Sequence, residues 1–432
     1  MKVVIWATEA DKATIRLCGI PLLQRHLYTL RSANMRDVIL VVGSKDLVGQ
    51  EIGDGDDLGL CLAYCLPDQL REHIDGTFLM IEANYVIDER IIRQLAKGQE
   101  MAIAYDSRTV STQGLSDRRE IRVVSENGKV TRLSAHEGQG TYVGASRCSP
   151  QILPLLENHP LVACLNKAVR MFDFAALDVA AIEPYVTETR RELPVLWFRI
   201  ESKEDVEHCK RILVRGAEKR TLDVLAWYFN RPIENWITYH IADFPITPNL
   251  MSLLTFIVAF FVTFLLLSGW LLPAALLAFV VNVMDGLDGK LARVKGMATK
   301  LGQLEHSLDL LYEQSWYIAL SWATYRQDGE PLALALGFAA ILFDSFARHV
   351  SMQFKQVMRI SLADYAPFDR RFRRFDGRRN IYTIYILLGA LLGLPHYALV
   401  AIGLHAFITG VVYFLRAANH LHNADRGFSV RN

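Results

Sequence analysis

Residues 285–293 read Asp-Gly-Leu-Asp-Gly-Lys-Leu-Ala-Arg, and they come directly after a long apolar segment without a single charged residue. That uncharged segment, residues 244–284, is long enough for two membrane-spanning helices, each of which needs about 20 apolar residues. Asp285 and Asp288 are three residues apart, so both carboxylates lie on one side of a helix. The stretch therefore predicts an acidic site at the end of the second of two membrane spans.

A second acidic pair, Glu305 and Asp309, follows at a spacing of four residues and again shares one helix face. An antiparallel hairpin would bring the four carboxylates together near the membrane surface, where unpaired charges are costly or become protonated. Hard oxygen ligands favour Mg²⁺ or Mn²⁺, which also take phosphate oxygens as ligands. We therefore expect a divalent cation held by Asp285, Asp288, Glu305 and Asp309.

This arrangement suits a substrate that contains a diphosphate. The cation would neutralise the diphosphate, while a carboxylate accepts the proton of an attacking hydroxyl group. Gly289 and Ala292 leave room for a flat group or a close backbone, and Arg293 is placed to bind phosphate. The alternative is a solvated turn whose carboxylates pair with lysines. It would explain a lone pair of aspartates, but not the five fixed residues together.

The motif resembles the signature of the CDP-alcohol phosphotransferase family, D-x2-D-G-x2-A-R-x8-G-x3-D-x3-D. The positions in register are Asp285, Asp288, Gly289, Ala292, Arg293 and Gly302. The resemblance implies a homodimer of six-span subunits whose site opens to the cytosol. It also implies transfer of a substituted phosphate from a CDP-alcohol to an acceptor alcohol, with release of CMP. The first three acidic positions would hold metal, the last would be the base, and the residues implied to bind nucleotide are Gly289, Ala292, Arg293 and Gly302.

The second half of the signature is displaced by one residue. Counted from Gly302, the last two acidic positions fall on His306 and Leu310. Glu305 and Asp309 each come one residue early. A one-residue deletion would give Glu305 the third metal position and Asp309 the base role, and Gly302 would then not be the family's glycine. In the other interpretation His306 is a ligand, there is no fourth carboxylate and the enzyme is inactive. We favour the deletion because it keeps an acidic pair at i,i+4.

The C-terminal half predicts six membrane spans. They cover residues 250–267, 271–284, 301–325, 331–351, 381–394 and 397–415. The loops at residues 290–300 and 355–379 are rich in Lys and Arg, whereas the loops on the other side are short and nearly free of them. Because positively charged loops stay inside, we expect both termini and the active site to face the cytosol of the cell (inner) membrane.

The N-terminal half has the mixed composition of a soluble domain. Short β-branched runs at residues 3–7, 37–43 and 77–82 alternate with helical patterns at residues 22–32 and 89–97. This alternation predicts an α/β domain with a parallel sheet. No signal peptide precedes the first run, so we expect this domain in the cytosol.

The soluble domain also resembles sugar-phosphate nucleotidyltransferases, with landmarks at residues 19–23 and 77–88. The Gly-rich phosphate loop is replaced by residues 7–12, Ala-Thr-Glu-Ala-Asp-Lys, whose carboxylates would repel phosphate. The lysine expected before Pro21 is Ile20, and the metal-binding aspartate position holds Asn84. We therefore expect a nucleotidyltransferase-like (Rossmann-like) domain kept for assembly, regulation or ligand sensing rather than for catalysis.

The fusion of the two halves is similar to bifunctional inositol-phosphate cytidylyltransferase/di-inositol-phosphate-phosphate synthase proteins. The predicted organisation is a nucleotidyltransferase-like domain at residues 1–216, an interfacial amphipathic connector at 217–249, an all-α six-helix transmembrane domain at 250–420 and a cytosolic tail at 421–432. The aromatic residues and charges of the connector suit a helix at the membrane surface. An ordinary linker helix packed on the soluble domain is the alternative.

Two arginines are weaker candidates for binding the acceptor. Arg348 in the fourth span could hold a phosphate or carboxylate of the substrate, or could simply pair with Asp344. Arg378 precedes the fifth span, where related inositol-phosphate-using enzymes carry an arginine, although a positive-inside cluster explains it as well.

We therefore predict a Mg²⁺-dependent (or Mn²⁺-dependent) membrane transferase that makes a phospholipid or a related phosphodiester. Its expected partners are a CDP-alcohol donor, an alcohol acceptor, membrane lipids and a second copy of the chain. The formal net charge is only +1, and no nucleic-acid partner is expected. One alternative is a non-catalytic scaffold with both halves degenerate, which the one-residue shift favours. A transporter is the other; the intramembrane charges favour it, and the nucleotide-type motif argues against it.

Overall fold

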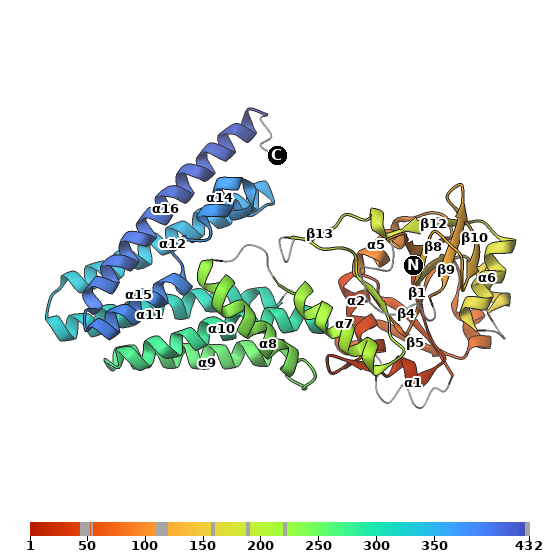
Figure 1. Cartoon of the computed structure of the whole chain (residues 1–432), viewed down its shortest axis with the longest axis horizontal. Coiled ribbons are helices and arrows are strands. Elements are labelled where there is room, and N and C mark those ends of the chain that lie inside the picture. The colour runs from red at the N-terminus through yellow and green to blue at the C-terminus, as the bar shows by residue number, and fades with distance from the viewer. Residues whose placement is uncertain are drawn as a thin grey trace.

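The computed structural model describes residues 1–43, 52, 55–108, 120–156, 160–186, 191–218, 223–299 and 301–427. These residues form an α/β domain followed by a helical domain, joined through a short helical connector (Figure 1). The N-terminus lies in the α/β domain, and the C-terminus lies at the end of the last long helix, α16 (Pro395–Asp425).

A nine-stranded sheet forms the centre of the α/β domain, in the order β5-β4-β1-β6-β11-β8-β12-β10-β9. The strands are β1 (Lys2–Ala7), β4 (Asp37–Val42), β5 (Cys61–Cys65), β6 (Phe78–Glu82), β8 (Ala102–Asp106), β9 (Arg122–Glu126), β10 (Lys129–Ser134), β11 (Gly140–Cys148) and β12 (Phe174–Asp178). The first four strands along the chain that join this sheet are parallel to one another. β11 runs antiparallel to both β6 and β8.

The predicted α/β class is confirmed, but the sheet is mixed rather than wholly parallel. The strands of the parallel part have continuous apolar sequences. In β1, for example, Val3, Val4 and Ile5 are completely buried. Such runs are expected where helices cover both faces of a sheet. The antiparallel part begins with the hairpin of β9 and β10, which returns the chain without a helical crossover.

Four helices of the α/β domain pack beside this sheet or lead away from it: α2 (Leu22–Ser32), α5 (Glu89–Lys97), α6 (Leu161–Met171) and α7 (Lys203–Gly216). The connector follows α7 and contains a π-helical turn, η6 (Ala226–Asn230), and helix α8 (Arg231–Ile241). Trp227, Tyr228, Phe229 and Trp236 are exposed on it. Exposed aromatic rings suit a helix at a membrane surface, and the interfacial position of the connector stays a prediction.

The helical domain contains six long helices among the described residues. They are α9 (Pro248–Leu267), α10 (Leu271–Lys295), α11 (Glu305–Asp328), α12 (Leu332–Met358), α15 (Arg379–Leu392) and α16. The short helices α13 (Leu362–Tyr365) and α14 (Pro367–Phe372) lie between α12 and α15. The predicted number of helices therefore agrees with the structure.

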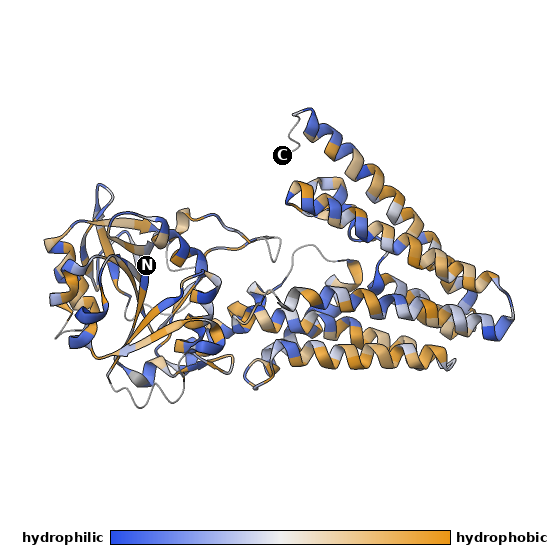
Figure 2. Ribbon diagram, turned by 180° about the vertical axis from the view of Figure 1, so that it is seen from behind, coloured by the Kyte–Doolittle hydropathy of each residue, from blue (hydrophilic) through white to orange (hydrophobic). Residues whose placement is uncertain are grey.

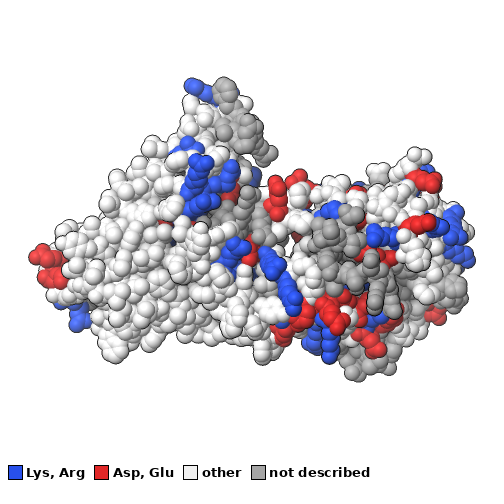
Figure 3. Space-filling view, in the orientation of Figure 1, with Lys and Arg blue, Asp and Glu red and all other residues white. Residues whose placement is uncertain are grey.

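Four of these helices, α9, α10, α12 and α16, are long and apolar enough to cross a membrane. α15 is apolar but shorter, and α11 carries several charged residues. The apolar residues of α9 and α16 cover much of their ribbons in Figure 2. On the face shown in Figure 3 the helical domain presents a broad surface without charge, while most of its visible Lys and Arg lie on the part nearer the α/β domain.

Two predicted spans differ in extent from the corresponding helices. The second span was expected to end at residue 284, but α10 continues to Lys295 and ends at Gly296, whose φ of +71° suits a glycine C-cap. Its apolar face continues through Leu287, Leu291 and Val294, all of which are buried. The third span was expected from residue 301, but residues 301–304 form a 3-10 turn and α11 begins at Glu305.

The C-terminal end of α10 packs against the α/β domain. Leu291 and Val294 of α10 share one buried cluster with Leu17, Leu22 and Phe198 of the α/β domain. We call this set, with its neighbours in the same cluster, the interdomain core. Burial of apolar side chains from both halves stabilises their contact by about 25 cal/mol per Å² removed from water.

A hydrogen bond reinforces the same junction. Arg25 of α2 is buried, and its Nη2 donates to the backbone oxygen of Val294 at 2.7 Å. Backbone carbonyls at a helix C-terminus lack partners within the helix and favour a nearby cation. The connector also packs closely against the α/β domain. A Cβ atom added to Gly19 of that domain would lie 2.7 Å from the backbone oxygen of Asp243 in the connector.

Candidate active site

The two aspartates of the motif lie on α10, one turn before the interdomain core. Ser252 Oγ on α9 donates to Asp288 Oδ2 at 2.6 Å. Asp285 accepts from Arg379 Nη2 at 2.5 Å and from the Tyr312 hydroxyl at 3.2 Å. Side chains from α9, α11 and α15 therefore hold the two carboxylates in place.

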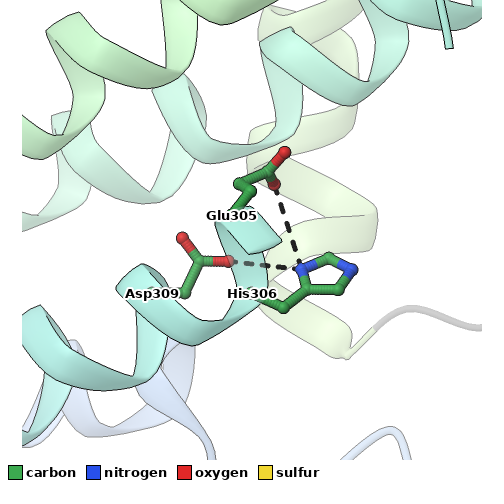
Figure 4. A group of neighbouring side chains, drawn as sticks. All are labelled: Glu305, His306 and Asp309. Atoms are coloured by element: carbon green, nitrogen blue, oxygen red, sulfur yellow. Dashed lines mark hydrogen bonds and ion pairs between the residues drawn. The ribbon is translucent and has the colours of Figure 1, made fainter. Parts of the chain in front are cut away.

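The second acidic pair lies at the start of α11 together with His306. His306 Nδ1 is 3.4 Å from Asp309 Oδ2 and 3.9 Å from Glu305 Oε1. Figure 4 shows the imidazole between the two carboxylates. One ligand atom from each of the three side chains can lie within 4.8 Å of the others, which is close enough for a shared metal ion.

The residues present fit a divalent cation. Asp309 is buried, and its Oδ1 has no hydrogen-bond partner within the part of the chain that the structure describes. An unpaired buried carboxylate oxygen is costly, and a cation would satisfy it. Oxygen ligands on two helices are also the donor type that Mg²⁺ and Mn²⁺ prefer.

The structure brings the predicted metal ligands near one another in two groups. Tyr312, which follows Asp309 by about one turn on α11, donates to Asp285 of α10 at 3.2 Å, so the acidic residues of the two helices lie on adjacent turns. The compact group on α11 contains Glu305, His306 and Asp309 but neither aspartate of α10. His306 and Glu305, the two competing candidates for the third position, thus lie side by side.

Three of the four residues implied to bind nucleotide lie on the last two turns of α10. A Cβ atom on Gly289 would be 3.3 Å from Arg293 Nη1, so the guanidinium lies over the glycine. Arg293 Nε donates to the backbone oxygen of Ala217 at 2.9 Å. Ala292 precedes Arg293 on the same helix. Gly302 is further along the chain, in the 3-10 turn, where its N–H donates to Thr299 Oγ1 at 3.1 Å.

The two acceptor candidates are both paired with carboxylates. Arg348 on α12 donates to Glu313 of α11 and, at 2.8 Å, to Asp344 Oδ2 of its own helix. Arg378, just before α15, donates from Nε to Asp376 Oδ2 at 2.9 Å. The pairing of Arg348 with Asp344 is the simpler of the two interpretations that its sequence position allowed.

Sequence reasoning missed two features of this site. Arg379 joins Asp285 to Glu313, whose Oε1 is 3.3 Å from Arg379 Nη1, and it is buried at the first residue of an apolar helix. Its charge at the start of such a helix was the available signal. Ser252 and Tyr312 carry no signal, because their partners are far away in the sequence.

The connector touches α10 between the two aspartates. A Cβ atom on Gly286 would lie 2.4 Å from Cδ of Glu234 on α8. Glu234 Oε2 is 2.9 Å from Lys290 Nζ, and both residues are buried. The Glu234 carboxylate can reach Lys290 only because Gly286 has no side chain. Helix α8 therefore packs directly against the helix that carries the motif.

Comparison with known proteins extends over both halves of the chain. Residues 245–412 match the family model described as CDP-alcohol phosphatidyltransferase, which confirms the resemblance of the motif. A curated protein of Rubrobacter xylanophilus, named bifunctional IPC transferase and DIPP synthase, is 24% identical over 415 residues, covering 91% of this chain and 88% of that protein. A protein of the same name from Aquifex aeolicus is 22% identical and covers 72% of each chain.

Among solved structures, the inositol-1-phosphate CTP transferase from T. maritima is similar to the α/β part. The similarity covers 47% of this chain and 90% of that one, at 15% identity and a TM-score of 0.38.

Proposed function

We propose, from the premise that residues 245–412 form a CDP-alcohol phosphotransferase domain, that this chain transfers a substituted phosphate group from a CDP-alcohol to an acceptor alcohol and releases CMP. One observation carries the proposal. Asp285 of α10 accepts a hydrogen bond from Tyr312, about one turn after Asp309 on α11, and a buried oxygen of Asp309 lacks a partner among the described residues. A site that must bind both a cation and a diphosphate needs such an arrangement.

Asp285, Asp288, Glu305 and Asp309 would hold Mg²⁺ or Mn²⁺. When bound, the cation neutralises the diphosphate and stabilises the leaving CMP. Ser252 and Arg379 orient the two α10 carboxylates through the hydrogen bonds that they donate. These partners keep the acidic side chains in place before substrate arrives.

Asp309 would act as the general base. The acceptor hydroxyl attacks the phosphorus that carries the alcohol substituent, a new P–O bond forms, and the P–O bond to CMP breaks. The proton of the hydroxyl passes to the Asp309 carboxylate. His306, 3.4 Å away, orients that carboxylate. This assignment follows the one-residue deletion in the family signature, with Glu305 in the third acidic position.

Gly289, Ala292 and Arg293 are proposed for the nucleotide. Gly302 joins them only if the family signature applies without the one-residue deletion. Arg293 is held over Gly289 by its bond to Ala217, so its position does not depend on the substrate. Arg348 and Arg378 are the proposed acceptor-binding residues. Because each already donates to a carboxylate, an acceptor phosphate would have to share the guanidinium.

The product is proposed to be a phospholipid or a related phosphodiester. The names of the relatives, which combine a transferase with a synthase, support a synthetic role. We also propose a multi-pass protein of the cell (inner) membrane with both termini and the site in the cytosol, working as a homodimer. The α/β domain is proposed to have lost catalysis, since Asn84 stands where the related enzymes bind metal.

CMP release by the purified protein tests the function. The assay contains Mg²⁺, either CDP-diacylglycerol or CDP-inositol, and a pool of polar alcohols. Asp309→Asn should abolish release, because an amide accepts no proton. The matched control is Asp328→Asn, an exposed residue at the far end of the same helix, which should leave release unchanged. Folded protein that neither releases CMP nor binds a CDP-alcohol would favour the scaffold instead.

A further inference from the structure

The segment between α12 and α15 packs at the end of a candidate membrane span. Helix α16 contains no Asp, Glu, Lys or Arg from residue 395 to residue 415, and Arg416 is the first such residue after that run. At about 1.5 Å per residue the run is about 30 Å long, which matches the hydrocarbon core of a bilayer. The Arg416 side chain therefore lies where hydrocarbon gives way to headgroups.

Helix α14 is held at this level by its contacts with α16 (Figure 1). Arg416 Nε donates to Asp369 Oδ1 at 2.7 Å, and His420 Nε2 lies 2.7 Å from Asp369 Oδ2. Asp369 and His420 are both buried. The guanidinium of Arg416 also lies over the ring of Phe368, 4.9 Å from its centroid. Helix α14 is thus fixed at the boundary that Arg416 marks.

Two aromatic rings of this segment are exposed at that boundary. Phe368 is 51% exposed and Phe375 is 62% exposed. Phe368 stacks on Phe372, with ring centroids 6.1 Å apart and ring planes 10° apart. Interfacial segments insert apolar rings of this kind between headgroups and acyl chains. The exposed rings therefore suit a lipid surface better than water.

Three exposed arginines accompany the rings: Arg370, Arg371 and Arg374. Within the described ranges none of the three forms a salt bridge with a carboxylate. The Arg370 side chain donates only to a backbone oxygen, that of Asp364, at 2.9 Å. Their positive charge is therefore not neutralised by the described part of the chain.

The neighbouring arginines are neutralised by the protein itself. Arg373 Nη1 is 2.9 Å from Asp376 Oδ1, and Arg378 Nε is 2.9 Å from Asp376 Oδ2. Asp376 is completely buried. The chain thus provides a carboxylate for these two arginines and leaves the charge of the three exposed ones to an anion from outside.

We propose that Phe368, Arg370, Arg371, Arg374 and Phe375, which we call the basic surface, bind the headgroups of anionic phospholipids. The arginines contact the phosphate groups, and the two rings insert beside them. The lipids belong to the leaflet on the side of the candidate site, because the same segment leads into Arg379, which donates to Asp285. The inference stands whether or not the site has the proposed activity.

Native mass spectrometry of the purified full chain in detergent tests this, because it counts the lipid molecules bound to the protein. The probes are phosphatidylglycerol, which is anionic, and phosphatidylcholine, which is zwitterionic, each titrated separately. We expect phosphatidylglycerol to bind at least tenfold more tightly, since each basic residue near anionic lipid strengthens binding about fivefold.

A triple variant, Arg370→Gln/Arg371→Gln/Arg374→Gln, should weaken phosphatidylglycerol binding about tenfold or more and leave phosphatidylcholine binding unchanged. Some preference should remain, because Lys355 and Arg359 are exposed just before this segment. The matched control is Arg36→Gln/Arg71→Gln/Arg170→Gln, which removes the same charge from exposed positions of the α/β domain. It should leave the binding of both lipids unchanged.

An excess of inorganic phosphate separates a lipid surface from a site for soluble anions. It should displace none of the bound phosphatidylglycerol, because free phosphate has no acyl chains to place beside the rings. Three results would overturn the proposal: equal binding of the two lipids, an equal loss in the two triple variants, or displacement of phosphatidylglycerol by phosphate. Thermal unfolding in the same detergent shows whether each variant is folded.

Discussion

The guanidinium of Arg379 lies between two acidic side chains: its Nη2 is 2.5 Å from Asp285 Oδ2, and its Nη1 is 3.3 Å from Glu313 Oε1. Three helices meet at this one side chain, because Asp285 is on α10, Glu313 on α11 and Arg379 on α15. Arg379 is buried. The charge of a proposed metal ligand is thus balanced by the protein itself before any cation arrives.

Replacing Arg379 should destabilise the helical domain. Arg379→Ala leaves Asp285 without its cation, whereas Glu313 keeps Arg348, and breaking a buried ion pair costs about 3–5 kcal/mol. We expect a lower unfolding temperature in detergent, and a larger increase on adding Mg²⁺ than the unaltered protein shows, since the cation takes over the lost charge. Arg379→Lys should lower the unfolding temperature less, because lysine keeps the positive charge although it cannot make the bidentate contact. An unchanged unfolding temperature in Arg379→Ala would contradict this role.

Adding a methyl group at Gly286 should disturb the site from the connector side. In Gly286→Ala the new Cβ meets the Glu234 carboxylate, so the Glu234–Lys290 pair must open, at a cost of about 1–3 kcal/mol. We expect a lower unfolding temperature and slower CMP release. Adding Glu234→Ala should restore part of both, as a double-mutant cycle would show. Gly403→Ala, where the nearest atom is 3.8 Å away, is the control.

Glu305 and His306 can be told apart by their separate replacement. If Glu305 occupies the third metal position, Glu305→Gln should lower CMP release about 100-fold or more, and excess Mg²⁺ should recover part of it. His306→Ala should lower release only about tenfold, as expected for a residue that orients a ligand. EDTA should abolish release until Mg²⁺ is added back. The reverse order of the two effects would assign the position to His306.

The stability of the α/β domain should depend on pH through Glu82. Burial raises its pKa from 4.5 to about 7, so the folded state binds the proton more tightly than the unfolded state does. Its contribution is therefore fully present below pH 4.5 and is lost as the pH rises through 7. Glu82→Gln cannot ionise, so relative to the unaltered protein it should gain up to about 3 kcal/mol between pH 5 and pH 8.

His26 acts in the opposite direction in the same domain. Burial lowers its pKa from 6.5 to about 4, so its contribution is present above pH 6.5 and is lost as the pH falls through 4. The two effects oppose each other in the unaltered protein. Thermal unfolding of Glu82→Gln from pH 4.5 to 6.5 should therefore rise more steeply with pH than that of the unaltered protein. Parallel curves would show that Glu82 does not titrate as inferred.

Loss of Arg25 should loosen the end of α10. Arg25→Ala removes the hydrogen bond to Val294, and a hydrogen bond from a charged donor contributes about 1.5–3 kcal/mol. We expect faster amide hydrogen exchange in the last turns of α10. Arg36→Ala, an exposed arginine of the same domain, should leave exchange unchanged. Equal exchange in both variants would mean that the apolar contacts alone fix this helix end.

The sequence predicted those parts of the site that depend on local spacing. Asp285 and Asp288 share one helix because their separation of three residues fits the helical repeat, and the same holds for Glu305 and Asp309. Contacts between segments that are distant in the sequence could not be predicted from it. Arg379 and Asp285 are 94 residues apart, and nothing in either segment alone indicates the other.

The sequence likewise predicted part of the fold. Apolar runs gave the parallel strands and the number of long helices. The antiparallel strands were missed because β11 reads Gly-Thr-Tyr-Val-Gly-Ala-Ser-Arg-Cys, which is no apolar run although the strand is buried along its whole length. The extension of α10 to Lys295 was missed because its last turns are apolar toward the α/β domain rather than toward lipid.

The interdomain core has a consequence for how the protein is made. Ribosomes release the N-terminal residues first, and domains fold as units in that order. The surface formed by Leu17, Leu22 and Phe198 is therefore complete before Leu291 and Val294 leave the ribosome. Helix α10 finishes folding against a template that already exists, and a shortened chain that starts at the membrane helices would leave that helix end apolar, exposed and prone to aggregate.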